Sequence, residues 1–160
     1  MEISKLIYSI ILTVMPVTEL RAGLPLALSF AKESGIPVFL IFLLIVLINI
    51  LMIFVIFFFL DNLHDKFMEI KIYRYLFNKY LKKIQKKVDK FEKKYNEKGF
   101  LALAVFVAIP LPGTGAWSGC LVSWLLGLNR KKSILAISAG VLIAGTLILF
   151  GSLGIINLFF

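Results

Sequence analysis

The chain alternates between long apolar runs and short polar interruptions, and this pattern predicts helices in a membrane. Residues 36–60 are apolar except for Asn49, and residues 133–150 carry no charge. A helix needs about 20 consecutive apolar residues to cross the hydrocarbon core of a bilayer, with some latitude on either side. We therefore expect transmembrane helices at 36–60 and 133–151.

Two further apolar stretches are each broken in the middle. Glu19 and Arg21 interrupt the first stretch between Pro16 and Pro25, and a Pro-Leu-Pro-Gly-Thr-Gly sequence that starts at Pro110 interrupts the second. At about 1.5 Å per residue, none of the resulting pieces reaches across a core about 30 Å thick. Each broken stretch is therefore either one kinked crossing or a re-entrant hairpin, which enters and leaves by the same face.

The positive charges favour the hairpins. Twelve of the 18 Lys and Arg residues lie at 61–98 and three more at 130–132, whereas Lys5 and Lys32 flank the other ends of the apolar runs. Cytoplasmic loops of membrane proteins carry an excess of Lys and Arg. Two crossings with two hairpins put both basic segments in the cytoplasm, whereas four crossings put one of them outside.

The predicted fold is an all-α integral membrane protein with two inverted repeats in a single domain of 160 residues. Each repeat is a re-entrant helical hairpin followed by a transmembrane helix. Hairpin 3–31 enters from outside and hairpin 99–128 from the cytoplasm, so both termini are predicted outside the cell membrane. Paired interrupted segments in the two halves of a chain are typical of transporters with a site at the bilayer midplane.

A long basic amphipathic helix is predicted at 61–98, between the two repeats, with Gly99 as its stop. Its apolar stripe recurs at spacings of four and three residues: Phe77, Leu81, Ile84, Val88, Phe91 and Tyr95. The stripe fits a coiled-coil surface for a partner. It also fits a helix on the lipid headgroups or packed on its own protein, and the aromatic, Lys-flanked pattern favours this second interpretation.

The two breaks provide the candidate site. Glu19 is the only acid inside an apolar stretch, and a charge at mid-membrane costs roughly 2.5–3.5 kcal/mol, so we interpret it as a protonation switch. Arg21 is a fixed positive charge for phosphate or carboxylate oxygens. The half-helices expected to begin at Ala22 and Ala116 offer free N–H groups and a positive dipole end to an anion. The alternative is that Glu19 and Arg21 only neutralise each other and cap the hairpin.

Smaller residues complete the breaks. Gly113 and Gly115 let backbone approach a ligand closely, and Thr18 and Thr114 offer hydroxyls. The residues expected to shape the hairpins are Pro16, Pro25, Pro110 and Pro112.

Other chemistry has little support in the sequence. The single cysteine, Cys120, excludes an intrachain disulfide and is expected to pack. His64 is expected to be a solvated residue at the membrane edge, and Trp117 and Trp124 are expected to pack or to anchor at the interface. No nucleophile with a base, phosphate-binding loop or metal cluster is visible, so we expect no enzyme, cofactor or metal. The net charge of +9 is explained by membrane-flanking segments and not by nucleic acid.

The paired motifs resemble those of the small multidrug export protein family. The likeness rests on Pro-Val-Thr-Glu-Leu-Arg-Ala-Gly-Leu-Pro at 16–25 and Ile-Pro-Leu-Pro-Gly-Thr-Gly-Ala-Trp-Ser-Gly at 109–119, and it covers nearly the whole chain. More distantly, the chain is similar to the DedA (VTT-domain) superfamily, whose inverted re-entrant hairpins are linked to moving phospholipids or polyprenyl phosphates between leaflets. That resemblance implies that Glu19 is the membrane acid of the first hairpin. The arginines that the superfamily carries at its second proline motif are absent here between 99 and 129, so Arg21 or the bases at 130–132 would contact the headgroup.

The breaks and the resemblance together predict a membrane transporter that moves an anionic amphiphile, a polyprenyl phosphate or phospholipid headgroup, between leaflets with coupling to protons. The alternatives are a proton-coupled exporter of small molecules or drugs and a membrane-anchored adaptor whose helix at 63–95 recruits a partner. The expected partners are the bilayer and a lipid or lipid-linked phosphate, with no nucleic acid. A homodimer is also expected to be feasible, and Ala136, Gly140 and Ala144 form one small-residue face for it.

Overall fold

A computed structural model describes the backbone of residues 2–111 and 113–159, and their side chains except those at 2, 65, 80, 83–98 and 155–159. The described residues form seven α-helices and no strand. The helices are α1 (Glu2–Val14), α2 (Glu19–Ser34), α3 (Val38–Asn62), α4 (His64–Met68), α5 (Lys71–Ala108), α6 (Ala116–Leu125) and α7 (Arg130–Phe159). The prediction of an all-α protein is confirmed.

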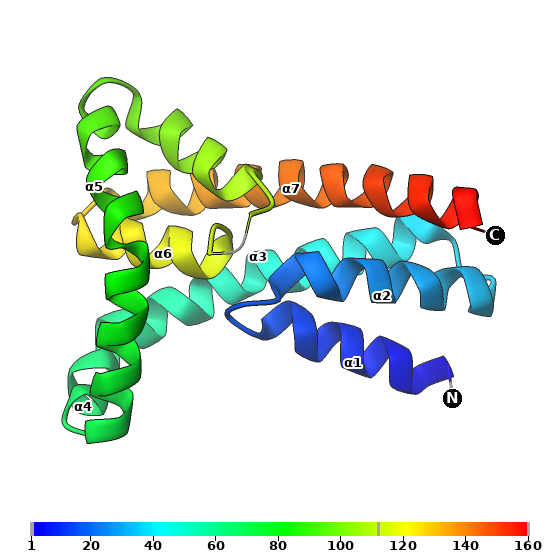
Figure 1. Ribbon diagram of the computed structural model, residues 1–160, viewed down its shortest axis with the longest axis horizontal. Coiled ribbons are helices and arrows are strands. Elements are labelled where there is room, and N and C mark those ends of the chain that lie inside the picture. Colours follow the sequence, from blue (N-terminus) through cyan, green and yellow to red (C-terminus); the bar gives the residue numbers. More distant parts are fainter. Residues whose placement is uncertain (1, 112, 160) are drawn as a thin grey trace.

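Helices α3 and α7 are long and apolar enough to cross a membrane. The candidate spans, Val38–Asn62 and Arg130–Gly154, have 25 residues each. At 1.5 Å per residue, each is about 37 Å long and exceeds a hydrocarbon core of about 30 Å. Both helices run along the long axis of the molecule (Figure 1). The two segments predicted to be transmembrane are therefore helices in the structure, and both are candidates to span a membrane.

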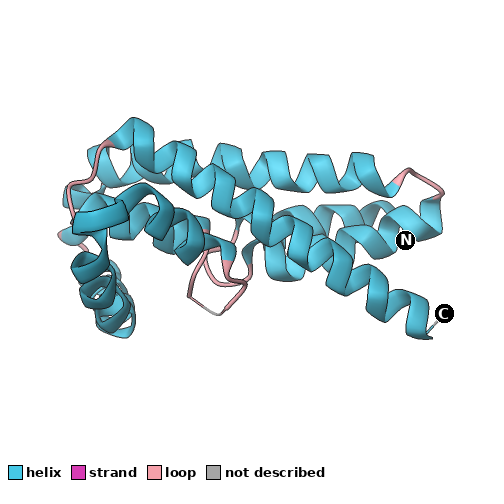
Figure 2. Ribbon diagram, turned by 90° about the horizontal axis from the view of Figure 1, so that it is seen from above, coloured by secondary structure: helices cyan, strands magenta, loops and turns pink. Residues whose placement is uncertain are grey.

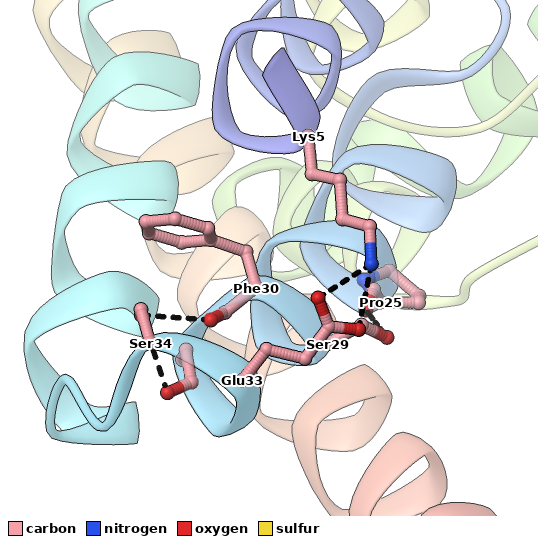
Figure 3. Close-up of polar contacts among 7 residues, drawn as sticks. Lys5, Pro25, Ser29, Phe30, Glu33 and Ser34 are labelled. Carbon is pink, nitrogen blue, oxygen red and sulfur yellow. Dashed lines mark hydrogen bonds and ion pairs between the residues drawn. The ribbon is translucent and has the colours of Figure 1, made fainter. Parts of the chain in front are cut away.

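Helices α1 and α2 pack side by side, and the turn that joins them, residues 15–18, lies near the middle of the molecule (Figure 1). Gly23 permits this close packing, because a Cβ there would lie 2.7 Å from the carbonyl oxygen of Ser9. At the other end of the pair, Lys5 Nζ lies 2.5 Å from a carboxylate oxygen of Glu33 (Figure 3). The ion pair therefore joins the open end of the two helices.

The end of α5 and α6 form a second pair, whose turn also lies near the middle of the molecule (Figure 1). Ile109 is extended, with φ −74° and ψ 116°, because the ring of the following proline disfavours a helical conformation in the residue before it. Pro110 thus ends α5 at Ala108. Pro112, the other proline expected to shape this turn, lies outside the described residues.

The prediction that Gly99 stops the amphipathic helix is wrong. Helix α5 continues through Gly99 to Ala108, because the residues after the glycine are apolar helix formers and Pro110 is the first that cannot join. On the predicted stripe, Phe77 and Leu81 are partly buried and pack against the core. This agrees with a helix packed on its own protein. The side chains at 84, 88, 91 and 95 lie outside the described ones.

The small-residue face of α7 is not a free contact surface. Ala136 is 0% exposed and Ala144 8%. A Cβ on Gly140 would lie 2.7 Å from the carbonyl oxygen of Ala104, so α5 covers this face. The proposal of this face as a dimer contact is therefore wrong, because the small residues allow close approach within the same chain.

The two long helices meet the basic segments at one end of the molecule. Arg130 Nη2, at the start of α7, lies 2.6 Å from Asp61 Oδ1, near the end of α3. The guanidinium of Arg130 also lies 4.0 Å from the ring centroid of Phe57. Both termini of the chain lie at the opposite end (Figure 2). The end of α3 and the start of α7 are thus on the same side of the fold.

Candidate functional site

The start of α2 meets the start of α6 in the middle of the molecule. Glu19, the first residue of α2, is 6% exposed. Its two carboxylate oxygens accept hydrogen bonds from the backbone N–H groups of Ala116 and Trp117, at 3.1 Å each. These N–H groups open α6 and have no partner within the helix. Glu19 therefore caps α6 from another element, with its carboxylate at the positive end of the helix dipole.

The backbone on both sides of this contact has unusual conformations. Gly115 has a φ of 150°, and a Cβ there would overlap the Glu19 carboxylate. Glu19 itself has a φ of 44°. Among the described residues other than glycine, Glu19 alone has a positive φ. Such a conformation costs about 1–3 kcal/mol and persists only where the surroundings fix it. The strain indicates that the fold holds Glu19 in this position.

Arg21 binds the second turn directly. Its Nη2 donates to the carbonyl oxygen of Thr114 and, at 2.8 Å, to the Thr114 hydroxyl. The same hydroxyl lies 2.5 Å from the carbonyl oxygen of Ile109 and 2.7 Å from that of Leu111. Thr114 therefore closes its own turn and links it to α2.

Side chains from three elements cap the buried end of α1. The pairs are Thr18 Oγ1 with Leu12 O at 2.6 Å, Asn49 Nδ2 with Thr13 O at 3.3 Å, and Trp117 Nε1 with Val14 O at 3.0 Å. The last carbonyls of a helix have no partner within it, and leaving one buried without a bond costs about 1–3 kcal/mol. Half-length helices can therefore end inside this molecule.

A small recess opens beside these contacts. Its interior volume is about 10 Å³, which is room for about one water molecule. Glu19, Arg21 and Asn49 give it polar lining, and α5 and α7 give it apolar lining that includes Val107 and Val141. The recess thus has a charged side and an apolar side.

The structure brings most of the predicted site residues together. Glu19 and Gly115 line the recess, and Arg21 joins them there and contacts Thr114. Thr18 binds the end of α1. Gly113 lies in the second turn with a φ of 78°.

The first break is shorter than predicted. Helix α2 begins at Glu19, not at Ala22, so the turn spans only residues 15–18. Pro16 lies in this turn, whereas Pro25 lies inside α2. Pro25 therefore does not shape the turn itself. The expected start of the second half-helix at Ala116 is confirmed.

Two residues of the site were missed from the sequence. Asn49 was noticed only as the exception in an apolar run, and Trp117 was interpreted as packing or an interfacial anchor. The signal for Asn49 was a single amide at the centre of α3, where a polar group must find a partner. The indole N–H of Trp117 carries the same requirement when it is buried.

The prediction for His64 is wrong, because the residue is 6% exposed. Its Nδ1 lies 3.0 Å from the hydroxyl of Tyr73. Its ring centroid lies 4.4 Å from that of Phe77 and 5.1 Å from that of Trp124. His64 thus belongs to an aromatic cluster that connects α4, α5 and α6. Cys120 is fully buried, as predicted.

An all-helical fold with two candidate membrane-spanning helices, and with a buried Glu19 and a half-buried Arg21 between helix ends, indicates a helical membrane protein. The chain belongs to the family described as "Putative small multi-drug export protein", which it matches over residues 19–147. The match includes every residue named in the lining of the recess. No curated protein and no solved structure matches the chain. The resemblance to the DedA superfamily stays a prediction.

Proposed function

We propose that the protein is a transporter for an anionic amphiphile, with its site between two re-entrant hairpins formed by α1–α2 and by the end of α5 with α6. One observation carries the proposal: the carboxylate of Glu19 accepts hydrogen bonds from the first N–H groups of α6, which have no partner within that helix. The start of a helix is a binding site for anions. In this conformation, the protein fills that site with its own anion.

Support for the hairpins comes from the position of the turns and of the ion pair at Asp61 and Arg130. Non-helical backbone at membrane depth is stable only where protein buries it or where it lines a wet cavity. The bonds from the start of α2 to Thr114 and to the start of α6 support such burial for these backbone ends. The bond between Asp61 and Arg130 is compatible with two full crossings, α3 and α7, between hairpins that enter from opposite faces.

Glu19 acts as the gate in this proposal. When Glu19 is protonated, the N–H groups of Ala116 and Trp117 lose their bound negative charge. Arg21 and the helix dipole then attract a phosphate or carboxylate headgroup, whose apolar chains stay in the bilayer. When Glu19 ionises again, it displaces the headgroup, so release is coupled to the loss of a proton.

The test is transfer of a fluorescent anionic phospholipid between the leaflets of reconstituted vesicles. Arg21→Ala is expected to abolish transfer above the rate in protein-free vesicles, because the remaining site lacks its fixed positive charge. Lys66→Ala is the matched control, since Lys66 is an exposed base in α4 and does not line the recess. Equal transfer by Arg21→Ala and the unchanged protein would contradict the proposal.

A second candidate, a proton-coupled exporter of small cationic amphiphiles, is favoured by the family description and by an acid in the lining of the recess. In that case, a cation exchanges with a proton at Glu19. The two functions differ in what drives proton movement. An exporter releases protons when a cationic drug is added and does not respond to an anionic lipid, and the opposite response favours the first function.

A further inference from the structure

Asn49 lies halfway along α3 and is the sole polar residue between Val38 and Leu60. It is 1% exposed. Its Nδ2 donates to the carbonyl oxygen of Thr13 at 3.3 Å. Among the described side chains, its Oδ1 is one of two buried polar atoms without a hydrogen-bond partner.

A buried acceptor without a hydrogen-bond partner is destabilising, because it has given up its bonds to water. Capping of α1 uses Nδ2 alone. Asn49 lines the same recess as Glu19 and Arg21. The recess therefore combines donors for an anion with an acceptor that still lacks its donor.

We propose that Asn49 Oδ1 accepts a hydrogen bond from the transported molecule, and that the recess selects an anionic group with a neighbouring hydroxyl or N–H. The inference rests on the proposed function and adds a substrate class to it. A phosphate ester of a polyol meets the requirement. A phosphate diester with a simple alkyl headgroup has no such donor, and it leaves Oδ1 unbonded.

Two lipid probes of equal charge test the selection in vesicles of phosphatidylcholine. Acyl-labelled phosphatidylglycerol carries hydroxyls on its headgroup, whereas acyl-labelled phosphatidylmethanol has none. The unchanged protein is expected to move phosphatidylglycerol about tenfold faster, which corresponds to one bond of about 1.4 kcal/mol. Equal rates would overturn the role of Asn49 and leave the transport of anionic lipids standing.

Substitution at Asn49 tests the residue itself. Asn49→Leu is expected to remove the preference by slowing phosphatidylglycerol to the rate of phosphatidylmethanol. Ser123→Ala is the matched control, because Ser123 holds the other buried unpartnered oxygen and does not line the recess. A preference that survives in Asn49→Leu would overturn the assignment. If Asn49→Leu does not fold, the comparison of the two lipids on the unchanged protein still decides.

A pair of soluble probes separates a lipid headgroup from a free phosphate ester. Efflux of two diesters, glyceryl methyl phosphate and dimethyl phosphate, is measured from the same vesicles. A preference for glyceryl methyl phosphate without any lipid transfer keeps the role of Asn49 and overturns the transport of amphiphiles. If neither pair moves faster than in protein-free vesicles, both proposals are overturned.

Discussion

At the scale of single residues, the site depends on Glu19 as an anion supplied by the protein. Its carboxylate takes the place on α6 that the sequence indicated for a ligand. Gly115 makes this possible, because any Cβ there would overlap the carboxylate. The sequence indicated Glu19 and Gly115 as candidates for the site, but it did not predict that the two residues contact each other.

Glu19→Gln should lower the thermal stability of the purified protein in detergent. The glutamine amide has one acceptor oxygen, and its NH2 group faces the second N–H donor. One N–H of α6 therefore loses its hydrogen bond, which lowers the free energy of unfolding by about 2 kcal/mol. Thermal unfolding followed by circular dichroism measures the loss. Glu33→Gln is the control, since its ion pair with Lys5 is exposed and contributes about 1 kcal/mol or less. Equal loss in both variants would argue against a special role for the Glu19 bonds.

Gly115→Ala should destabilise the fold more than Gly35→Ala. Both glycines have a positive φ, of 150° and 70°, but a Cβ at Gly35 meets nothing within 4 Å. The difference between the two melting temperatures therefore contains the clash with Glu19 and the greater backbone strain at Gly115, whose φ of 150° and ψ of −167° lie in a region that is essentially restricted to glycine. Adding Glu19→Ala to Gly115→Ala should recover part of that difference, because the new methyl group then has space. If the double variant recovers no stability, the destabilisation by Gly115→Ala does not come from the clash with Glu19.

At the scale of helices, the long apolar elements were predictable and the buried helix ends were not. The runs that form α3 and α7 exceed the length needed for a crossing, so their positions follow from local sequence. The start of α6 is capped by the side chain of Glu19, which is 97 and 98 positions away from the two donors. The local sequence pattern also predicted the wrong C-terminal end for the amphipathic helix. The helix continues through Gly99, because a single glycine does not end a helix when the residues after it are helical.

His64→Ala should loosen the junction of α4, α5 and α6. The substitution removes the hydrogen bond to Tyr73 and the ring contacts with Phe77 and Trp124, and we expect a loss of about 2–3 kcal/mol. His64→Phe keeps a ring and should recover most of the loss. Thermal unfolding of the two variants measures this. An unchanged melting temperature for His64→Ala would contradict a packed cluster.

At the scale of the whole molecule, two short helix pairs meet between two long helices. Contacts between the turns, from Glu19 to α6 and from Arg21 to Thr114, join segments that are far apart in the sequence. The charge pattern of the sequence favoured hairpins over four crossings. The ion pair between Asp61 and Arg130 then places the ends of both long helices together.

The most direct test of two hairpins that meet inside the membrane is the accessibility of single cysteines in intact cells. The native thiol is first removed by Cys120→Ala, and single cysteines then replace the exposed residues Lys32, Lys66 and Lys131. An impermeant thiol reagent should label the cysteine at 32 in intact cells, and those at 66 and 131 only after permeabilisation. Labelling of 66 and 131 from opposite sides would contradict the account, because the second broken stretch would then cross the membrane completely and the two hairpins would not form an inverted pair.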